Sequence, residues 1–235
     1  NSLNAKTTNR NLINAIISTE DKNFYKHNGI SLRGIFGAIF INIYEGRGPF
    51  SGHGGSTITQ QVSKLICLLN TNNKDEKYCR RQTLVRKLLE AIFSIVLEIK
   101  FSKNDILTFY INNVYLGNGN IGFEAASNNY FKKSSKNISL SEAAMLAGLL
   151  KAPSKYSPIK NLEISQKRSK LVLNLMLKQN YISLEDYEYS SKNLAKLENK
   201  YKNGRHYAEW VKSDVFKSVK KINNKMSIFP FFDLK

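Results

Sequence analysis

Two short blocks of polar and small residues hold the side chains best suited to chemistry. The first spans residues 18–31 and places Glu20 and Asp21 directly after the apolar run 12–17. A carboxylate at the end of a packed element can act as a general base if its surroundings raise its pKa towards neutrality. The two acidic side chains are therefore candidates for that role. The simpler alternative is an exposed acidic pair or a helix-terminal capping group.

The second block, residues 54–61, reads Gly-Gly-Ser-Thr-Ile-Thr-Gln-Gln and runs from a Gly-rich loop into a helix. Such a start gathers free backbone N–H groups and hydroxyls where an anion can bind. Thr57, Gln61 and Lys64 are spaced i, i+4 and i+7, so their hydroxyl, amide and ammonium groups share one helix face. We expect them to face a cleft together with Ser56 and Gln60. The alternative is a capped helix with a surface glutamine pair.

These blocks resemble the first two motifs of the family 51 glycosyltransferases, the peptidoglycan glycosyltransferase domain of class A penicillin-binding proteins. Three further stretches follow in the family's order: Arg-Lys-Leu-Leu-Glu at 86–90, residues 102–117 ending in Tyr-Leu-Gly, and Arg168 with Val172, Leu173 and Met176. Five motifs in order across residues 15–176 are a specific signal, whereas any one alone is weak. The resemblance implies a mainly α, lysozyme-like fold with a larger globular lobe and a small membrane-facing lobe. It also implies a glycosyltransferase domain over residues 1–200, with 201–235 as a C-terminal extension or the start of a linker to a further domain.

The resemblance implies a reaction that polymerises lipid II into glycan strands with inversion at the anomeric carbon. The acceptor hydroxyl is a poor nucleophile and needs a base, whereas the leaving lipid pyrophosphate needs positive charge. Glu20 is the implied general base, and Glu90 is a second catalytic glutamate that orients cations near the pyrophosphate. The implied substrate-binding residues are Asp21, Ser56, Thr57, Gln60, Gln61, Lys64, Arg86, Lys87 and Asn112.

Helical spacing predicts how the residues of the third motif, 86–90, pair with one another. Arg86 and Glu90 are four residues apart, so a salt bridge between them is the simplest account, and it leaves Lys87 free to face phosphate. In the other motifs we interpret Tyr110 as a packing residue and His27 as a structural residue that positions its loop. The chain departs from the family pattern at Gly37, Leu65 and Ser169, where relatives often carry Arg, Asn and a second basic residue.

The charge of the chain indicates what kind of partner it binds. The 235 residues include 36 Lys and Arg against 18 Asp and Glu, a net charge of +18. This excess predicts an anionic partner, although charge on solvated faces is an alternative. The resemblance implies lipid II and the growing glycan strand, an anionic membrane surface and other cell-wall synthesis proteins, with no nucleic acid. It places the protein at the outer, periplasmic face of the bacterial cell membrane, with an anchor preceding Asn1.

Two rival functions remain open at this stage. One is a lytic transglycosylase of the same fold, which also works with one glutamate but needs no pyrophosphate clamp. The other is a basic module that binds a membrane or nucleic acid without catalysis. We find no metal-ligating set, and a divalent cation, Mg or Mn, is left open as a cofactor.

Two further features allow two readings each. The apolar stretch from Gly34 to Tyr44 is too short to span a bilayer, so it is either a segment that dips into the membrane interface or a core helix. Cys67 and Cys79 either form a disulfide in an oxidising compartment or remain unpaired thiols, and we expect the thiols.

The hydrophobic pattern predicts a nearly all-helical chain. The expected helices cover residues 11–19, 32–45, 57–69, 79–100, 102–112, 139–150, 162–179, 183–197 and 207–221. Residues 46–55 and 70–77 are expected to be loops. The longest helix, 79–100, carries an apolar stripe that includes Leu88, Ile92, Ile95 and Ile99.

Overall fold

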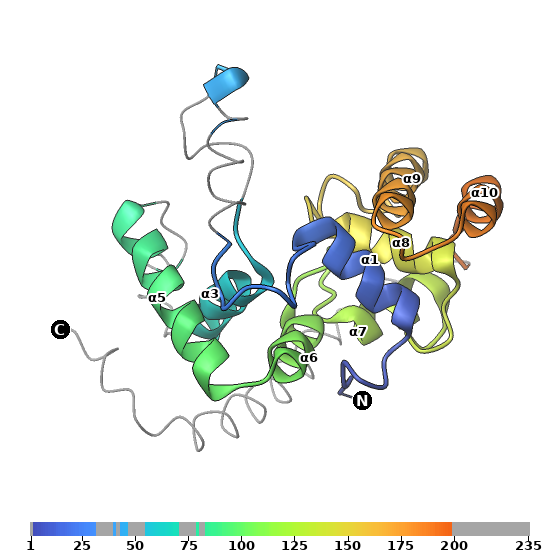
Figure 1. The fold of residues 1–235 in the computed structure, drawn as a ribbon. Helices are drawn as coiled ribbons and strands as arrows, with labels where there is room; N and C mark the ends of the chain where they lie inside the picture. The colour runs from blue at the N-terminus through green and yellow to red at the C-terminus, as the bar shows by residue number, and fades with distance from the viewer. Residues whose placement is uncertain are drawn as a thin grey trace.

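The predicted mainly helical fold is confirmed by a computed structural model, which describes residues 2–31, 40, 43–46, 55–70, 79 and 83–198. The named helices in these ranges are α1 (Arg10–Glu20), α3 (Ile58–Asn70), α5 (Leu84–Lys100), α6 (Lys103–Asn113), α7 (Phe123–Phe131), α8 (Leu140–Leu149), α9 (Leu162–Lys178) and α10 (Leu184–Lys192). Figure 1 shows their arrangement. The described residues contain a lone antiparallel bridge, between Tyr115 and Ile121.

Local sequence sets where several helices begin. Ser102 starts α6 and Ser139 starts α8, each through a capping box with an acidic residue three positions later, Asp105 and Glu142 respectively. The Asn9 side chain accepts two backbone N–H bonds at the start of α1. These caps satisfy N–H groups that have no partner inside the helix, so the chain enters each helix at a defined residue.

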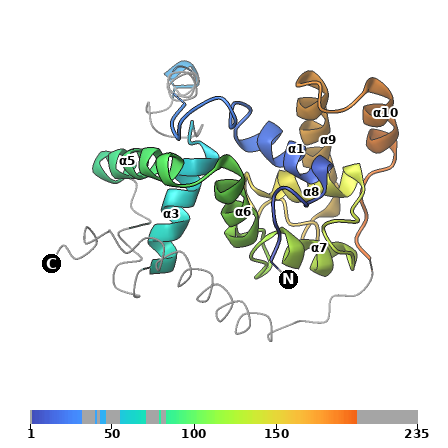
Figure 2. The same ribbon diagram turned by 60° about the horizontal axis from the view of Figure 1, so that its bottom comes forward.

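The larger group of helices surrounds α8, whose residues 141–149 are all buried. This helix packs against α1 and α9, and α7 and α10 complete the group (Figures 1 and 2). A helix that is apolar on every side must lie inside the protein, which makes α8 the centre of the core. The main contributors from its neighbours are Leu12 and Ile16 of α1 and Val172 and Met176 of α9.

The smaller group consists of α3 and α5, and α6 contacts both of them as well as α7. In both views α3 and α5 lie to one side of the larger group (Figures 1 and 2). This division agrees with the predicted larger and smaller lobes. A disulfide joins Cys67 of α3 to Cys79. The expectation of unpaired thiols was therefore wrong, because the fold brings the two Cα atoms to 6.0 Å.

The outer face of α5 is apolar and exposed. Leu88, Ile92, Ile95 and Ile99 have exposed fractions of 42% to 78%. The apolar stripe predicted for this helix therefore does not pack into the described core. No helix in the described ranges is long and apolar enough to cross a membrane.

Several element boundaries differ from the prediction. We expected no helix at α7, which begins at Phe123, directly after the N-cap residue Gly122 with its φ of 79°. α5 begins at Leu84 rather than at Cys79, because the Thr83 hydroxyl accepts the backbone N–H of Arg86 and caps the helix there. Some predictions concern residues outside those that the structure describes. These are the helix at 207–221 and the C-terminal segment 201–235, together with most of the helix at 32–45 and of the loops at 46–55 and 70–77.

Candidate active site

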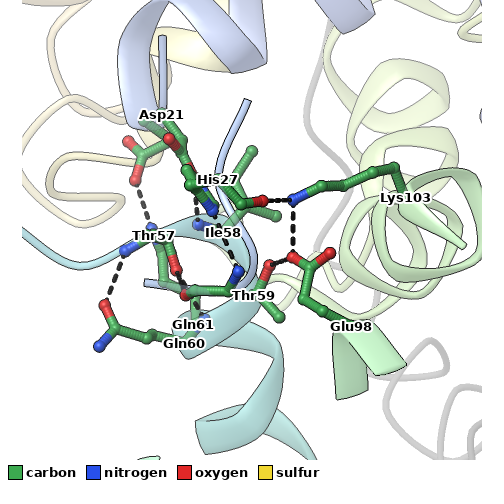
Figure 3. Close-up of polar contacts among 11 residues, drawn as sticks. Asp21, His27, Thr57, Ile58, Thr59, Gln60, Gln61, Glu98 and Lys103 are labelled. Carbon is green, nitrogen blue, oxygen red and sulfur yellow. Dashed lines mark hydrogen bonds and ion pairs between the residues drawn. The ribbon is translucent and has the colours of Figure 1, made fainter. Parts of the chain in front are cut away.

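The loop that follows α1 is fastened to the start of α3. Oδ2 of Asp21 accepts a 3.0 Å hydrogen bond from the backbone N–H of Ile58 and lies 2.8 Å from Nε2 of His27 (Figure 3). The backbone N–H of Gly29 donates to Nδ1 of His27, which places the imidazole proton of neutral His27 on Nε2, directed at Asp21. His27 therefore positions the loop, as predicted. Both bonds are made by the same oxygen, Oδ2 of Asp21, so this carboxylate, expected to bind substrate, also fastens the loop.

Thr57 and Gln60 form the cap of α3. The backbone N–H of Gln60 donates to the Thr57 hydroxyl, and Oε1 of Gln60 accepts the backbone N–H of Thr57 (Figure 3). Their exposed fractions are 1% and 3%. The prediction that both side chains face an open cleft was wrong in placement, because the cap needs them at the buried helix start.

A glycine allows the loop to approach α5 closely. Gly29 has a φ of +88°, and a Cβ atom there would lie 2.6 Å from the carbonyl oxygen of Ser94. Its own carbonyl oxygen accepts a 2.6 Å bond from the Thr57 hydroxyl. Any other residue at this position would collide with the backbone of α5 and would be strained at this φ.

A second set of bonds joins the loop to α3, α5 and α6. Nζ of Lys103 donates to the carbonyl oxygen of His27 at 2.6 Å and to Oε1 of Glu98 at 2.7 Å. The Thr59 hydroxyl donates to the same carboxylate oxygen at 2.6 Å (Figure 3). Sequence reasoning assigned no role to Glu98 or Thr59, because these contacts connect residues far apart in the chain.

Glu20 ends α1 and is held by an amide from α3. Nε2 of Gln61 donates a 2.7 Å bond to Oε2 of Glu20, and Oε1 of Gln61 accepts a 3.1 Å bond from the Tyr110 hydroxyl. Burial raises the pKa of Glu20 above its ordinary value, and the Gln61 bond and the charges of Arg168 and Lys151 limit the rise. A carboxylate with a raised pKa is a stronger proton acceptor than an exposed one, as a general base requires.

The cations of the third motif converge on Glu90. Arg86 binds one of its carboxylate oxygens, and Nζ of Lys87 lies 3.0 Å from the other and 2.6 Å from the Ser56 hydroxyl. The predicted pair of Arg86 and Glu90 is present, but the prediction that Lys87 is left free was wrong. Burial, followed by the charges of Arg86 and Lys64, lowers the pKa of Lys87 to about 8.

A small hollow lies between α3 and α5 beside these cations. Lys64, Arg86 and Glu90 line it together with the disulfide between Cys67 and Cys79. The side chain of Lys87 is 45% exposed at this end of α5. Three of the predicted site residues, Lys64, Arg86 and Glu90, thus line one hollow, and Lys87 is joined to it through its bond to Glu90.

Asn112 is engaged elsewhere. Its side chain accepts a hydrogen bond from the backbone N–H of Leu3 and donates to the carbonyl oxygens of Leu3 and Thr108. These contacts fasten the N-terminal segment to α6, and they account for the whole amide group. The structure gives no contact between Asn112 and the other predicted site residues.

Two cations near Glu20 were missed as site residues. Arg168 of α9 and Lys151, which follows α8, both lower the pKa of Glu20 through their charge. Nε of Arg168 is buried and has no hydrogen-bond partner among the described residues. The fifth motif contains Arg168, so the motif itself was the signal. The departure at Ser169 is fully buried, where its hydroxyl faces the carbonyl oxygen of Ser141 in α8.

Comparison with known proteins gives consistent matches. A family model described as Transglycosylase matches residues 1–177. Penicillin-binding protein 1A of Aquifex aeolicus (strain VF5) is 41% identical over 227 residues, which cover 95% of this chain and 30% of the relative. Penicillin-binding protein 1A of Streptococcus pneumoniae (strain ATCC BAA-255 / R6) is 44% identical over 177 residues, covering 75% of this chain and 23% of the relative.

Among solved structures, the crystal structure of Penicillin-Binding Protein 1A from Haemophilus influenzae is 26% identical with a TM-score of 0.40. The match covers 69% of this chain and 20% of that chain. The chain therefore spans less than a third of the length of these relatives.

Proposed function

Because the chain belongs to the transglycosylase family, the family 51 glycosyltransferases, we propose that it is a peptidoglycan glycosyltransferase that polymerises lipid II into glycan strands. The observation that carries the proposal is the placement of one carboxylate and several cations. Glu20 has a raised pKa and accepts a hydrogen bond from the Gln61 amide, while Arg86 and Lys87 bind Glu90, and Lys64 lines the hollow beside Arg86 and Glu90. A base and a cationic site for a leaving group are what this reaction requires.

In the proposed mechanism Glu20 accepts the proton of the acceptor hydroxyl. The hydroxyl oxygen forms a bond to the anomeric carbon of the donor, and the bond from that carbon to the pyrophosphate oxygen breaks on the opposite face. Configuration therefore inverts in one displacement, and the proton ends on Glu20. Gln61 keeps the carboxylate directed while the charge on Glu20 is neutralised.

The lipid pyrophosphate leaves with its negative charge and needs no proton. Lys64, Arg86 and Lys87 supply positive charge where that charge develops. Glu90 takes no proton in this mechanism. It holds Arg86 and Lys87 in place through both of its carboxylate oxygens.

The substrate carries a lipid, so we propose that the protein works at the outer face of the bacterial membrane. The net charge of +18 suits anionic headgroups. Phe40 and Tyr44, from the apolar stretch singled out in the sequence, are 71% and 85% exposed. Exposed aromatic side chains of this kind partition into the membrane interface, which would place the site next to lipid II and the growing strand. Other cell-wall synthesis proteins remain proposed partners.

A divalent cation, Mg or Mn, was left open by the sequence. In the ranges that the structure describes, no group of three or more His, Cys, Asp or Glu side chains converges to hold a metal ion. We therefore assign no ligand residues and route no step of the mechanism through a metal. Comparing polymerisation in EDTA with polymerisation in added Mg²⁺ or Mn²⁺ tests the requirement directly.

The proposed function is tested by incubating the protein with labelled lipid II and separating the products by gel electrophoresis. We expect a ladder of glycan polymers that is absent with Glu20→Gln. A folded protein that makes no polymer would overturn the proposal. Cleavage of preformed glycan instead would favour the lytic alternative, and salt-steep DNA binding without glycan synthesis would favour a nucleic-acid module.

A further inference from the structure

We propose that Tyr110 is a positioning residue for Glu20, and that its buried hydroxyl acts through the side-chain amide of Gln61. The inference rests on the proposed role of Glu20 as the general base. The sequence interpretation treated Tyr110 as a packing residue, and its 0% exposure is consistent with packing. Its hydroxyl, however, reaches the residue that holds the base.

The three side chains come from three different helices. Tyr110 lies on α6, Gln61 on α3 and Glu20 at the end of α1. The Tyr110 hydroxyl donates to Oε1 of Gln61 at 3.1 Å, and Nε2 of Gln61 donates to Oε2 of Glu20 at 2.7 Å. An amide has an accepting end and a donating end, so a donor on one end directs the other. Tyr110 thus keeps the NH₂ group of Gln61 pointed at the carboxylate.

The same hydroxyl strengthens the bond to Glu20. A donor at the amide oxygen polarises the amide and makes its N–H groups better donors. Burial and the charge of Glu20 raise the pKa of Tyr110 well above its usual range, so the hydroxyl stays protonated and continues to donate. Tyr110 therefore supports the ionised form of Glu20, the form that can accept a proton.

Several other groups around Glu20 also shift its pKa. Burial and the neighbouring Asp21 raise the pKa of Glu20, whereas the Gln61 bond, Arg168 of α9 and Lys151 lower it. The Gln61 bond is the largest of the lowering influences. Weakening this bond should therefore raise the pKa of Glu20 further, even with both cations in place.

The test compares Tyr110→Phe with Tyr130→Phe. Tyr130, on α7, is a matched control because it is 1% exposed, its hydroxyl donates a 2.9 Å bond to the carbonyl oxygen of Leu116, and it is not among the groups that shift the pKa of Glu20. In Tyr110→Phe we expect the acid limb of the kcat/KM profile to move to higher pH. On that limb each pKa unit lowers kcat/KM about tenfold. At the pH optimum kcat should fall while KM stays unchanged, because Tyr110 is 0% exposed and so is not accessible to substrate.

A second readout does not depend on activity. NMR titration of the Glu20 carboxyl carbon in ¹³C-glutamate-labelled protein should show a higher pKa in Tyr110→Phe and an unchanged pKa in Tyr130→Phe. Gln61→Met, which removes the amide at similar volume, should shift the Glu20 titration in the same direction. If Tyr110→Phe does not fold, an unchanged titration in Gln61→Met would still overturn the proposal, because Tyr110 can act on Glu20 only through Gln61. In protein that already carries Gln61→Met, adding Tyr110→Phe should have no further effect.

The outcomes separate the two proposals. An unchanged Glu20 titration in folded Tyr110→Phe, or in Gln61→Met, would overturn the positioning role, and so would an equal shift in Tyr130→Phe. A shifted titration in a protein that makes no polymer would leave the positioning of Glu20 intact and overturn the proposed function instead.

Discussion

Nζ of Lys87 lies 3.0 Å from Oε2 of Glu90, one helical turn further along α5. The contact holds a cation whose pKa is lowered to about 8 by burial and by the charges of Arg86 and Lys64. A lysine with this pKa is charged below about pH 8 and loses its proton as the pH rises through that value. Its ability to bind a pyrophosphate group should therefore decrease as the pH rises through about 8.

Replacing Lys87 tests this cation. Lys87→Ala should lower turnover by about a hundredfold, because the charge of the leaving group grows towards the transition state. Lys87→Arg keeps its charge at high pH, so it should remove the alkaline limb near pH 8 from the kcat/KM profile measured with labelled lipid II. Lys192→Ala, an exposed lysine on α10, is the control. A loss as large in the control would show a bulk charge effect and defeat the site assignment.

Replacing Glu20 tests the base. Glu20→Gln should reduce polymerisation by roughly a hundredfold or more, the usual range for a lost general base, while the fold is kept. Because the pKa of Glu20 is raised, activity of the unaltered protein should fall as the pH drops through that raised value and protonates the carboxylate. Circular dichroism confirms folding, and Glu163→Gln, on the exposed start of α9, is the matched control. Turnover within a few-fold of the unaltered protein would remove Glu20 from the mechanism.

The disulfide predicts a measurable gain in stability. Cys67 and Cys79 are 12 residues apart, and closing a loop of this size is worth about 3 kcal/mol in the chain-entropy model. Replacing both with Ser should lower the free energy of unfolding in urea by about that amount. Mass spectrometry of non-reduced peptides should find the two segments joined. Free thiols after air oxidation would contradict the pairing.

The exposed aromatic side chain of Phe40 predicts membrane contact. Phe40→Ser should weaken binding to anionic vesicles about tenfold or more, because burying one aromatic ring is worth roughly 1.5–3 kcal/mol. The melting temperature should not change, since the ring is already 71% exposed. The control is Tyr189→Ser, which removes a 70% exposed ring from α10. Unchanged vesicle binding with a large drop in melting temperature would show that Phe40 belongs to the core. Phe36, the other aromatic residue of this apolar stretch, lies outside the described residues.

Features of the fold that depend on near neighbours were readable from the sequence. Ser102 and Ser139 cap their helices because each is followed three residues later by a carboxylate. The pairing of Arg86 with Glu90 follows from their spacing on one helix. In each case the two groups that interact are separated by a single helical turn.

Helix α7 shows where local reading fails. Phe123, Ala126 and Tyr130 recur at helical spacing and are buried. The six residues before the helix, 117–122, include three glycines and two asparagines, which are typical of a loop. Burial against α8 and α6 outweighs those weak local preferences, and the sequence gives no measure of that burial.

Most of the site depends on distant contacts. Tyr110 and Gln61 are 49 residues apart, and Ile58 and Asp21 are 37 apart, so no spacing rule connects either pair. Motif resemblance indicated segments for the site but not which side chains of those segments point inward. Thr57 and Gln60 were expected at an open face for that reason.

The bonds around the first loop have a mechanical consequence. Asp21, the residue after Glu20, is tied to α3, and the carbonyl oxygen of His27 is tied to Lys103 of α6. Glu20 itself is tied to Gln61, which shares α3 with Lys64. The helix that carries the cation therefore cannot slide past the helix that carries the carboxylate without breaking several short bonds at once. Any rocking of the smaller helix group against the larger one would therefore have to break the bond from Gln61 to Glu20, so these bonds act as a brace between the two groups.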